Sequence, residues 1–149
     1  LALCVMHMQG EPETMQTAPS YSDVVQDIAE FLSQRLVDVS GVGIDLDRVI
    51  IDPGFGFGKT AEQNFELLAR LSELQGIGQP VLVGLSRKSM ISSVLDRLPE
   101  QRMVASVALA LMAVERGARI VRVHDVAATF DALSMWQTMR YALSQSQPS

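Results

Sequence analysis

The chain has 149 residues, of which 48% are hydrophobic and 19% charged, and its formal net charge is −5 at pH 7. The composition is typical of a globular protein with one core, and the acidic balance argues against a general nucleic-acid surface. No apolar run reaches membrane-spanning length, and no secretion signal is recognised. The single cysteine, Cys4, lies in an apolar run, which indicates a small core residue in a reducing compartment and a cytoplasmic protein.

The sequence predicts four successive units, each made of an apolar strand, a polar or glycine-rich loop and a helix. Strands are expected over 1–8, 48–52, 80–84 and 118–124. Helical spacing predicts helices over 21–39, 60–76, 86–96, 101–116 and 126–143, with a polar loop over 11–20 and a polar tail over 144–149. The last helix carries an apolar stripe that includes Trp136. The expected helix caps are Ser20 or Ser22, Thr60, Ser86 and Asp125.

The four strands are apolar on both faces, which is typical of a parallel sheet covered by helices. Two α/β architectures fit this pattern: a small doubly wound sheet, or half of an eight-stranded β/α barrel. The chain begins inside a strand and without an initiator methionine, which favours the half barrel.

The most informative stretch runs from Asp52 to Lys59 and directly follows a strand. Its three alternating glycines allow sharp turns and close approach to a ligand, and Phe55 and Phe57 offer flat rings. Asp52 can accept paired hydrogen bonds from an amidine-like edge such as that of a pterin or guanine. As an alternative, Asp52 caps a helix or accepts loop N–H groups. Pro53 occupies the position where a phosphate-binding Walker loop needs glycine, which argues against a nucleoside triphosphatase.

Two further segments carry charge at strand ends. The run Ser86-Arg87-Lys88-Ser89 opens a predicted helix, where free N–H groups and two cations favour an anion. Arg122 and His124 alternate along the last strand and share one face, which suggests an oxyanion site. The alternatives are an ordinary capped helix and an arginine and histidine that pair within the fold.

The first strand contributes weaker signals. Met6 and Met8 share a face and are either core residues or an apolar wall for a flat ring. His7, on the opposite face, is expected to be a structural histidine. No cluster of histidine, cysteine and carboxylate has metal-ligand spacing.

Together these segments resemble the last four strand ends of the bacterial dihydropteroate synthases. The resemblance rests on four motifs in order: Cys4 to Gly10, Asp52 to Lys59, Gly84 to Met90, and Arg122 to Val126. It implies a TIM-type (β/α)8 barrel, of which residues 1–149 are the C-terminal half, strands five to eight, and form a pterin-binding domain.

The resemblance implies a transferase of folate biosynthesis and a target of sulfonamides. The implied reaction joins 6-hydroxymethyl-7,8-dihydropterin diphosphate to 4-aminobenzoate and gives 7,8-dihydropteroate and pyrophosphate. The implied pterin ligands are Asp52, Lys88, Met6, Phe57 and Gly84. Arg122 and His124 would bind the diphosphate and act with Lys88 in catalysis, and Ser89 and Arg87 would bind aminobenzoate. A homodimer is implied, with the apolar helix from Met103 and the Trp136 helix as candidate interfaces.

Some family features are absent from this sequence. Gln101 and Ala105 replace an acid and a glycine at packing positions. The first four family strands, with the Asn tied to Mg²⁺ and diphosphate, have no counterpart here, so a magnesium ligand is expected outside this chain. The isolated chain is therefore expected to be incomplete as an enzyme. The alternatives are a pterin-binding methyltransferase domain, which would transfer methyl from methyltetrahydrofolate, and a non-catalytic half barrel.

Overall fold

A computed structural model of the chain describes residues 1–10 and 20–145 and contains one parallel sheet with the strand order β1-β2-β3-β4. The strands are β1 (Leu3–Met6), β2 (Val49–Asp52), β3 (Val81–Val83) and β4 (Ala118–Val121). In this register Met6 lies opposite Asp52, and Val83 lies opposite Val121. All four strands were predicted, although each is shorter than expected. The predicted loop over 11–20 and tail over 144–149 lie largely outside the described residues.

The helices follow the predicted order. They are α1 (Val24–Gly41), α2 (Ala61–Ala69), α3 (Met103–Glu115) and α4 (Val126–Gln145), with 3-10 turns η1 (Leu46–Arg48), η2 (Leu71–Ile77), η3 (Ser89–Ser93) and η4 (Pro99–Gln101). The predicted helix over 60–76 is therefore α2 followed by η2, and that over 86–96 is only the short turn η3.

The cap of α1 differs from expectation, and the cap of α2 agrees. Asp23, and neither Ser20 nor Ser22, caps α1, because its carboxylate accepts the N–H groups of Val25 and Gln26 at 2.9 and 3.0 Å. Thr60 caps α2 as predicted. Its hydroxyl accepts the Gln63 N–H, and the Gln63 side chain accepts the Thr60 N–H, which closes a capping box.

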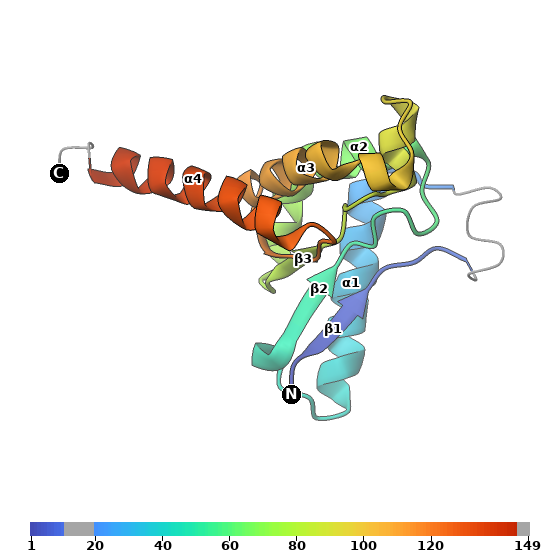
Figure 1. The fold of residues 1–149 in the computed structure, drawn as a ribbon. Helices are drawn as coiled ribbons and strands as arrows, with labels where there is room; N and C mark the ends of the chain where they lie inside the picture. The colour runs from blue at the N-terminus through green and yellow to red at the C-terminus, as the bar shows by residue number, and fades with distance from the viewer. Residues whose placement is uncertain (11–19, 146–149) are drawn as a thin grey trace.

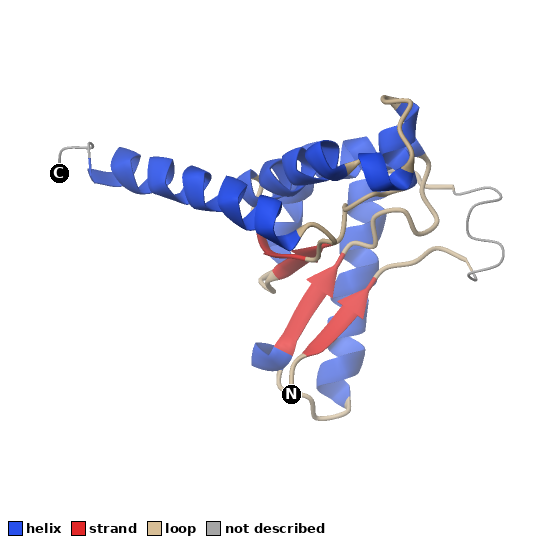
Figure 2. Ribbon diagram, viewed as in Figure 1, coloured by secondary structure: helices blue, strands red, loops and turns tan. Residues whose placement is uncertain are grey.

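The core lies between the sheet and the helices on one of its sides. Val49, Ile51, Val81 and Val83 point into it and are at most 1% exposed, with Ile28 and Leu32 of α1 among the opposing side chains. Figure 1 shows α1 behind β1 and β2, and Figure 2 shows the two strands with their near face open. Sequential strand order with helices on one face is the arrangement of a half barrel. A doubly wound sheet would reverse its strand order and carry helices on both faces.

The opposite face of the sheet is less covered. Met6 is 36% exposed and Ile120 is 39% exposed, and Cys4 on the same face as Met6 is also exposed. The prediction that Cys4 is a core residue is therefore wrong, because its side chain lies on the face of the sheet opposite the core, which none of the described helices covers.

The last helix leaves the body of the molecule. In Figure 1 α4 extends away from the sheet beyond its contact with α3. The stripe predicted on it is largely exposed, with Phe130 at 69% and Leu143 at 53%, whereas Trp136 is partly buried. Among the described residues, none of the helices combines the length and the hydropathy that a membrane span needs.

Replacing the Thr60 hydroxyl tests the capping box. We expect Thr60→Ala to lower the free energy of unfolding by about 1 kcal/mol, because it leaves the Gln63 N–H without its cap. Thr138→Ala is the matched control, since its hydroxyl donates to the Ser134 carbonyl within α4 and the change should stay within about 0.5 kcal/mol. Urea unfolding measures both, and equal losses in the two variants would contradict the assignment.

Candidate active site

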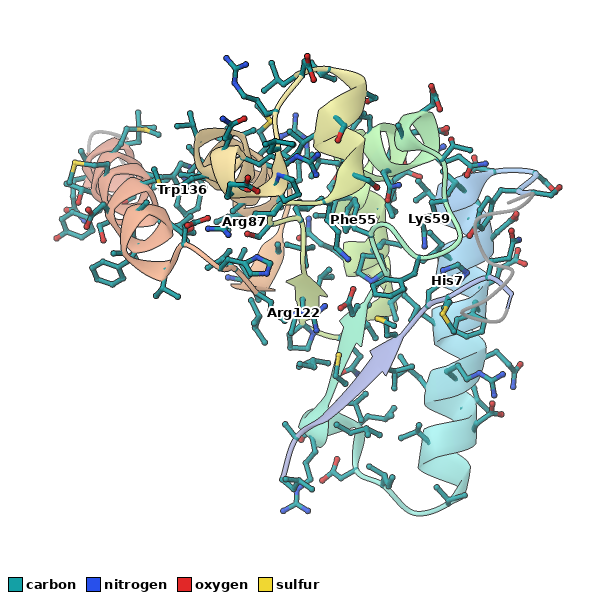
Figure 3. The ribbon with its side chains drawn as sticks, turned by 45° about the vertical axis from the view of Figure 1, so that its right-hand side comes forward. His7, Phe55, Lys59, Arg87, Arg122 and Trp136 are labelled. Carbon is teal, nitrogen blue, oxygen red and sulfur yellow. The ribbon has the colours of Figure 1, made fainter. Side chains whose placement is uncertain are left out.

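The carboxyl ends of the four strands meet at one edge of the sheet, as expected for parallel strands. Asp52 ends β2, the segment from Gly84 to Lys88 follows β3, and Arg122 and His124 follow β4. The His7 N–H continues the pairing of β1 by donating to the Asp52 carbonyl at 2.9 Å. Figure 3 shows His7, Lys59, Arg122 and Arg87 across this edge. The sequence placed these segments together, and the structure does so.

Asp52 is a buried carboxylate with unequal oxygens. The residue is 2% exposed, and its Oδ1 accepts the Gly54 N–H at 2.8 Å. Its Oδ2 lies 3.7 Å from Nη2 of Arg122, which is too far for a hydrogen bond. Burial raises the pKa of Asp52, while the Gly54 N–H, Arg122, Lys88 and Lys59 oppose that rise. A carboxylate has more acceptor sites than these partners use, so it can accept further donors from a ligand.

The glycine loop packs directly on the chain that follows β1. Gly54, Gly56 and Gly58 have φ values of 70, 79 and 63°, which side chains rarely adopt. A Cβ at Gly54 would collide with the carbonyl oxygen of His7, and one at Gly58 would lie 2.5 Å from the carbonyl oxygen of Gln9. Two of the three glycines are thus required by both dihedral angle and space.

The two phenylalanines of this loop have different environments. Phe55 is 1% exposed and belongs to the core, so the expectation that both rings face a ligand is wrong for Phe55. Phe57 is partly buried, and Nζ of Lys88 lies 4.3 Å from the centre of its ring. This is a cation–π contact. Burial and the nearby Arg122 lower the pKa of Lys88, whereas Asp52 raises it.

Lys59 ends the glycine loop but adds no cation to the open edge, because it is 3% exposed. Its Nζ donates to the carbonyl oxygens of Gly54 and Phe57 at 2.8 and 3.0 Å and lies 3.1 Å from Nδ1 of His7. Burial lowers the pKa of Lys59 to about 7, and burial with the Lys59 charge lowers that of His7 to about 4. His7 is a structural histidine, as predicted.

A small cavity lies between the β3 and β4 loops. It has a volume of about 190 Å³ and is lined by Gly84, Ser86, Lys88, Arg122, Val123 and His124. The Ser86 hydroxyl lies 3.2 Å from the His124 backbone nitrogen and 2.9 Å from Nδ1 of its ring. Ser86 therefore ties the two loops together and does not cap η3, which begins three residues later. The cavity offers the Lys88 and Arg122 cations, the His124 ring and one hydroxyl, which suit an anion.

Arg87 takes a left-handed backbone conformation, with φ of 60°, which is uncommon for a residue with a side chain. Its N–H donates to the Ser106 hydroxyl at 2.8 Å and its carbonyl accepts from Arg102 at 3.1 Å. Its guanidinium donates two hydrogen bonds to the Asp125 carboxylate, at 2.7 and 3.2 Å. Asp125 therefore pairs with Arg87 and does not cap α4 with its side chain, as had been predicted.

The remaining predicted ligands are more peripheral. Ser89 is exposed at the first residue of η3, and Met6 lies beside Asp52 in the strand register. Sequence reasoning missed Ser106, Arg102 and Asn64, whose side chain accepts the Gly56 N–H at 2.8 Å. Ser106 and Asn64 support the loops from α3 and α2, where their only signal is polarity on an otherwise apolar helix face, and Arg102 directly precedes α3.

The donor set does not fit a magnesium ion. Within residues 1–10 and 20–145, no three histidine, cysteine or carboxylate side chains come together as metal ligands. Magnesium prefers carboxylates, water and phosphate oxygens. The cavity beside Asp52 presents Lys88 and Arg122 and no second carboxylate.

The fold and this edge define one half of a β/α barrel, with a candidate ligand site at the carboxyl ends of its strands. A model of the pterin binding enzyme family matches residues 1–124, and the chain belongs to that family.

The relatives within the family are dihydropteroate synthases, in agreement with the four motifs. The protein from Haemophilus influenzae is 54% identical over 137 residues, which cover 92% of this chain and 50% of that protein. The structure of the Yersinia pestis enzyme in a sulfonamide drug complex is 45% identical, with a TM-score of 0.93 over 95% of this chain and 52% of that one. The Burkholderia cenocepacia enzyme, complexed with 7,8-dihydropteroate, is 51% identical with a TM-score of 0.89 over 97% and 54%. The chain thus spans about half the length of these relatives.

Adding one methyl group to Gly54 tests the close packing of the loop. We expect Gly54→Ala to lower the free energy of unfolding by at least about 2 kcal/mol, because the new Cβ meets the His7 carbonyl at an unfavourable φ. Gly41→Ala at the end of α1 is the control. Its Cβ would have nothing within 4 Å, and it should be neutral or add up to about 1 kcal/mol. Denaturant unfolding measures the free energy of unfolding of both variants. An unchanged value in Gly54→Ala would contradict the close packing of the loop on His7.

The buried amine predicts a pH dependence of stability. Lys59 has a pKa of about 7 in the folded chain against an ordinary value of 10.5, so between these values the unfolded chain binds more protons. The free energy of unfolding should therefore rise with pH across this range, by at most about 1.4 kcal/mol per pH unit. Urea unfolding across the range should show a smaller rise for Lys59→Gln than for the wild-type chain. Parallel profiles would contradict the lowered pKa.

Proposed function

We propose that residues 1–149 form the pterin- and diphosphate-binding half of a dihydropteroate synthase. The enzyme would be a transferase that makes 7,8-dihydropteroate and pyrophosphate from 6-hydroxymethyl-7,8-dihydropterin diphosphate and 4-aminobenzoate. Because the chain spans about half of its relatives, the complete active site would need residues outside it. The 7,8-dihydropteroate in the Burkholderia cenocepacia structure and the sulfonamide complex of the Yersinia pestis enzyme support this choice of substrates and of inhibitor class.

The observation that carries the proposal is the buried Asp52 carboxylate. One of its oxygens is held by the Gly54 N–H, and within residues 1–10 and 20–145 the other has no hydrogen-bond donor closer than Arg122 at 3.7 Å. A pterin presents an amino group and a ring N–H side by side, and one carboxylate can accept both. Lys88 and the Phe57 ring lie beside this position, and Gly84 adds no side chain that would fill it. Met6 would close the site from β1.

The cavity beside Asp52 would bind the diphosphate. Arg122 has a side chain that is 62% exposed, so it can turn from Asp52 toward an incoming anion. His124 is oriented by the Ser86 hydroxyl, and Lys88 reaches the same cavity. Cations that grip a departing anion stabilise charge where it develops in the transition state.

The proposed reaction balances without a redox partner. The 4-aminobenzoate nitrogen forms a bond to the pterin methylene carbon, while the bond from that carbon to the diphosphate oxygen breaks. Pyrophosphate leaves with the electron pair, and the new amine gives up one proton. Arg122 and His124 would stabilise the leaving group, and Lys88 would orient the pterin. Catalysis is then mainly electrostatic and needs no covalent enzyme intermediate.

The aminobenzoate would approach from the start of η3. Ser89 is exposed there and can donate to a carboxylate. Arg87 is already paired with Asp125, so we propose that its main contribution is to fix the backbone from which Lys88 and Ser89 project.

The other parts of the proposal concern partners outside the chain. Any Mg²⁺ that accompanies the diphosphate would need ligands from outside this chain. A homodimer is proposed through α3 and α4, whose exposed apolar residues include Val104, Phe130 and Tyr141. The cytoplasmic location stays a prediction.

Removing the charge of Asp52 tests the proposal. Isothermal titration with 6-hydroxymethylpterin diphosphate should show binding to the wild-type chain and a loss of about 10- to 100-fold in Asp52→Asn, because a charged acceptor is lost. Binding of inorganic pyrophosphate should persist, since it needs only the cation cavity. Asp96→Asn, on an exposed loop, should bind both ligands like the wild-type chain.

The outcomes separate the alternatives. A folded chain that binds neither ligand would be a non-catalytic half barrel. Binding of a pterin together with indifference to pyrophosphate would favour a methyltransferase, which has no diphosphate to hold. Equal affinities of the Asp52→Asn variant and the wild-type chain would reject the assigned pterin site.

A further inference from the structure

Lys59 is a buried cation to which the proposed reaction assigns no task. It is 3% exposed, and among the residues that the structure describes its polar contacts are two backbone carbonyls and one imidazole, with no carboxylate in contact. Burying an ammonium group without an ion-pair partner is costly. A hydrocarbon side chain would fill the same space more cheaply, so the amine must contribute something that packing alone does not.

The three contacts join two segments that are distant in sequence. Gly54 and Phe57 belong to the glycine loop, whereas His7 follows β1, 52 residues before Lys59. The Gly54 carbonyl also accepts the Phe57 N–H at 3.1 Å, which closes a turn. The Lys59 amine therefore holds both ends of that turn and links it to the neighbouring strand. Figure 3 shows Lys59 directed toward His7.

The amine satisfies these contacts in both of its protonation states. The ammonium form donates to both carbonyls and to Nδ1 of a neutral His7. The neutral form donates to the carbonyls, and its lone pair accepts a hydrogen bond from the Nδ1–H group of the other imidazole tautomer. The charged groups that face it are Asp52 from β2 and Lys88 from the β3 loop. Burial lowers the pKa of Lys59 to about 7. The His7 ring is itself held by α1, because it packs edge-on against Phe31 with ring centres 4.9 Å apart.

We propose that Lys59 is a positioning residue for the pterin site, which holds the Gly54–Phe57 turn against His7 and thereby fixes Asp52 and the Phe57 ring for a flat ligand. Gly54 touches the site through its N–H, which binds Asp52 Oδ1. Phe57 touches it through its ring, which faces Lys88. The buried Lys59 amine donates hydrogen bonds to the carbonyl groups of these same two residues. The identity of the ligand rests on the proposed function, whereas the effect on the turn does not.

Amide hydrogen exchange measured by NMR tests the effect on the turn without a ligand. In Lys59→Met the amides of Gly54 and Phe57 should lose about tenfold or more protection relative to the amides of Ile28 and Leu32 in α1. In Lys59→Gln, which keeps two N–H donors but not the full reach, the relative loss should be about threefold or more. Dividing the protection factors of the loop amides by those of the α1 amides removes the contribution of global stability. Unchanged ratios would overturn the proposal. If Lys59→Met does not fold, the ratios measured in Lys59→Gln are sufficient to decide.

Thr129→Val is the matched control for losing a buried polar group. Thr129 is 3% exposed, and its hydroxyl donates to the Asp125 carbonyl at 2.8 Å, away from the glycine loop. Its removal should reduce overall stability and leave the ratio of loop to α1 protection unchanged. A similar loop effect in Thr129→Val would show that the loop opens with any loss of stability, which would also overturn the proposal.

Titration then connects the turn to the ligand. The affinity of Lys59→Gln for 6-hydroxymethylpterin diphosphate should fall about tenfold, while its affinity for inorganic pyrophosphate stays within about twofold of the wild-type value. Equal losses for both ligands would indicate a merely structural role and overturn the proposal, as would unchanged pterin affinity with an opened turn. If the wild-type chain binds no pterin, the proposed function fails, and the exchange ratios still decide whether Lys59 holds the turn.

Discussion

The hydrogen bond from the His7 N–H to the Asp52 carbonyl fixes the geometry on which the candidate site depends. It extends the pairing of β1 and β2 to the point where both chains leave the sheet. The carbonyl of His7 then packs against Gly54, and the imidazole of His7 contacts the Lys59 amine. Only glycine fits in the space beside this carbonyl. The loop turns there, directly after β2, and the turn lets the Gly54 N–H donate a hydrogen bond to the Asp52 side chain.

The electrostatics of the edge follow from which charges are compensated within the fold. Asp52 lies among Arg122, Lys88 and Lys59, so one acid faces three basic groups. Lys59 is enclosed by the loop, and Arg87 is neutralised by Asp125. Lys88 and Arg122 remain as the cations of the cavity, and they repel each other, which contributes to the lowered pKa of Lys88. An anionic ligand would relieve this repulsion, although the chain as a whole is acidic.

The sequence predicted most of the elements because their signals are local. The apolar runs, the Thr60 helix cap and the alternating glycines each act within a few residues, and each is present. Apart from the α1 cap, which is one residue from the predicted Ser22, the failures concern contacts between distant segments. Ser86 and Asp125 look like helix caps, yet their partners, His124 and Arg87, lie 38 residues away along the chain. Lys59 and Phe55 look like ligand contacts, yet the packing of the loop on β1 and the core buries both. Cys4 looks like a core residue because its pattern does not reveal which sheet face is covered.

The two ends of the candidate site differ in how firmly they are held, and this difference suits the proposed chemistry. At the proposed pterin end, Asp52 and the glycine loop are buried and tied by backbone hydrogen bonds, so a rigid heterocycle would meet groups that are already in position. At the diphosphate end, the mostly exposed Arg122 side chain is long and holds Asp52 only loosely, at 3.7 Å. A leaving group must be gripped in the transition state and then released. Rigid recognition of the part that stays, combined with adjustable cations for the part that departs, meets both requirements within one edge of the sheet.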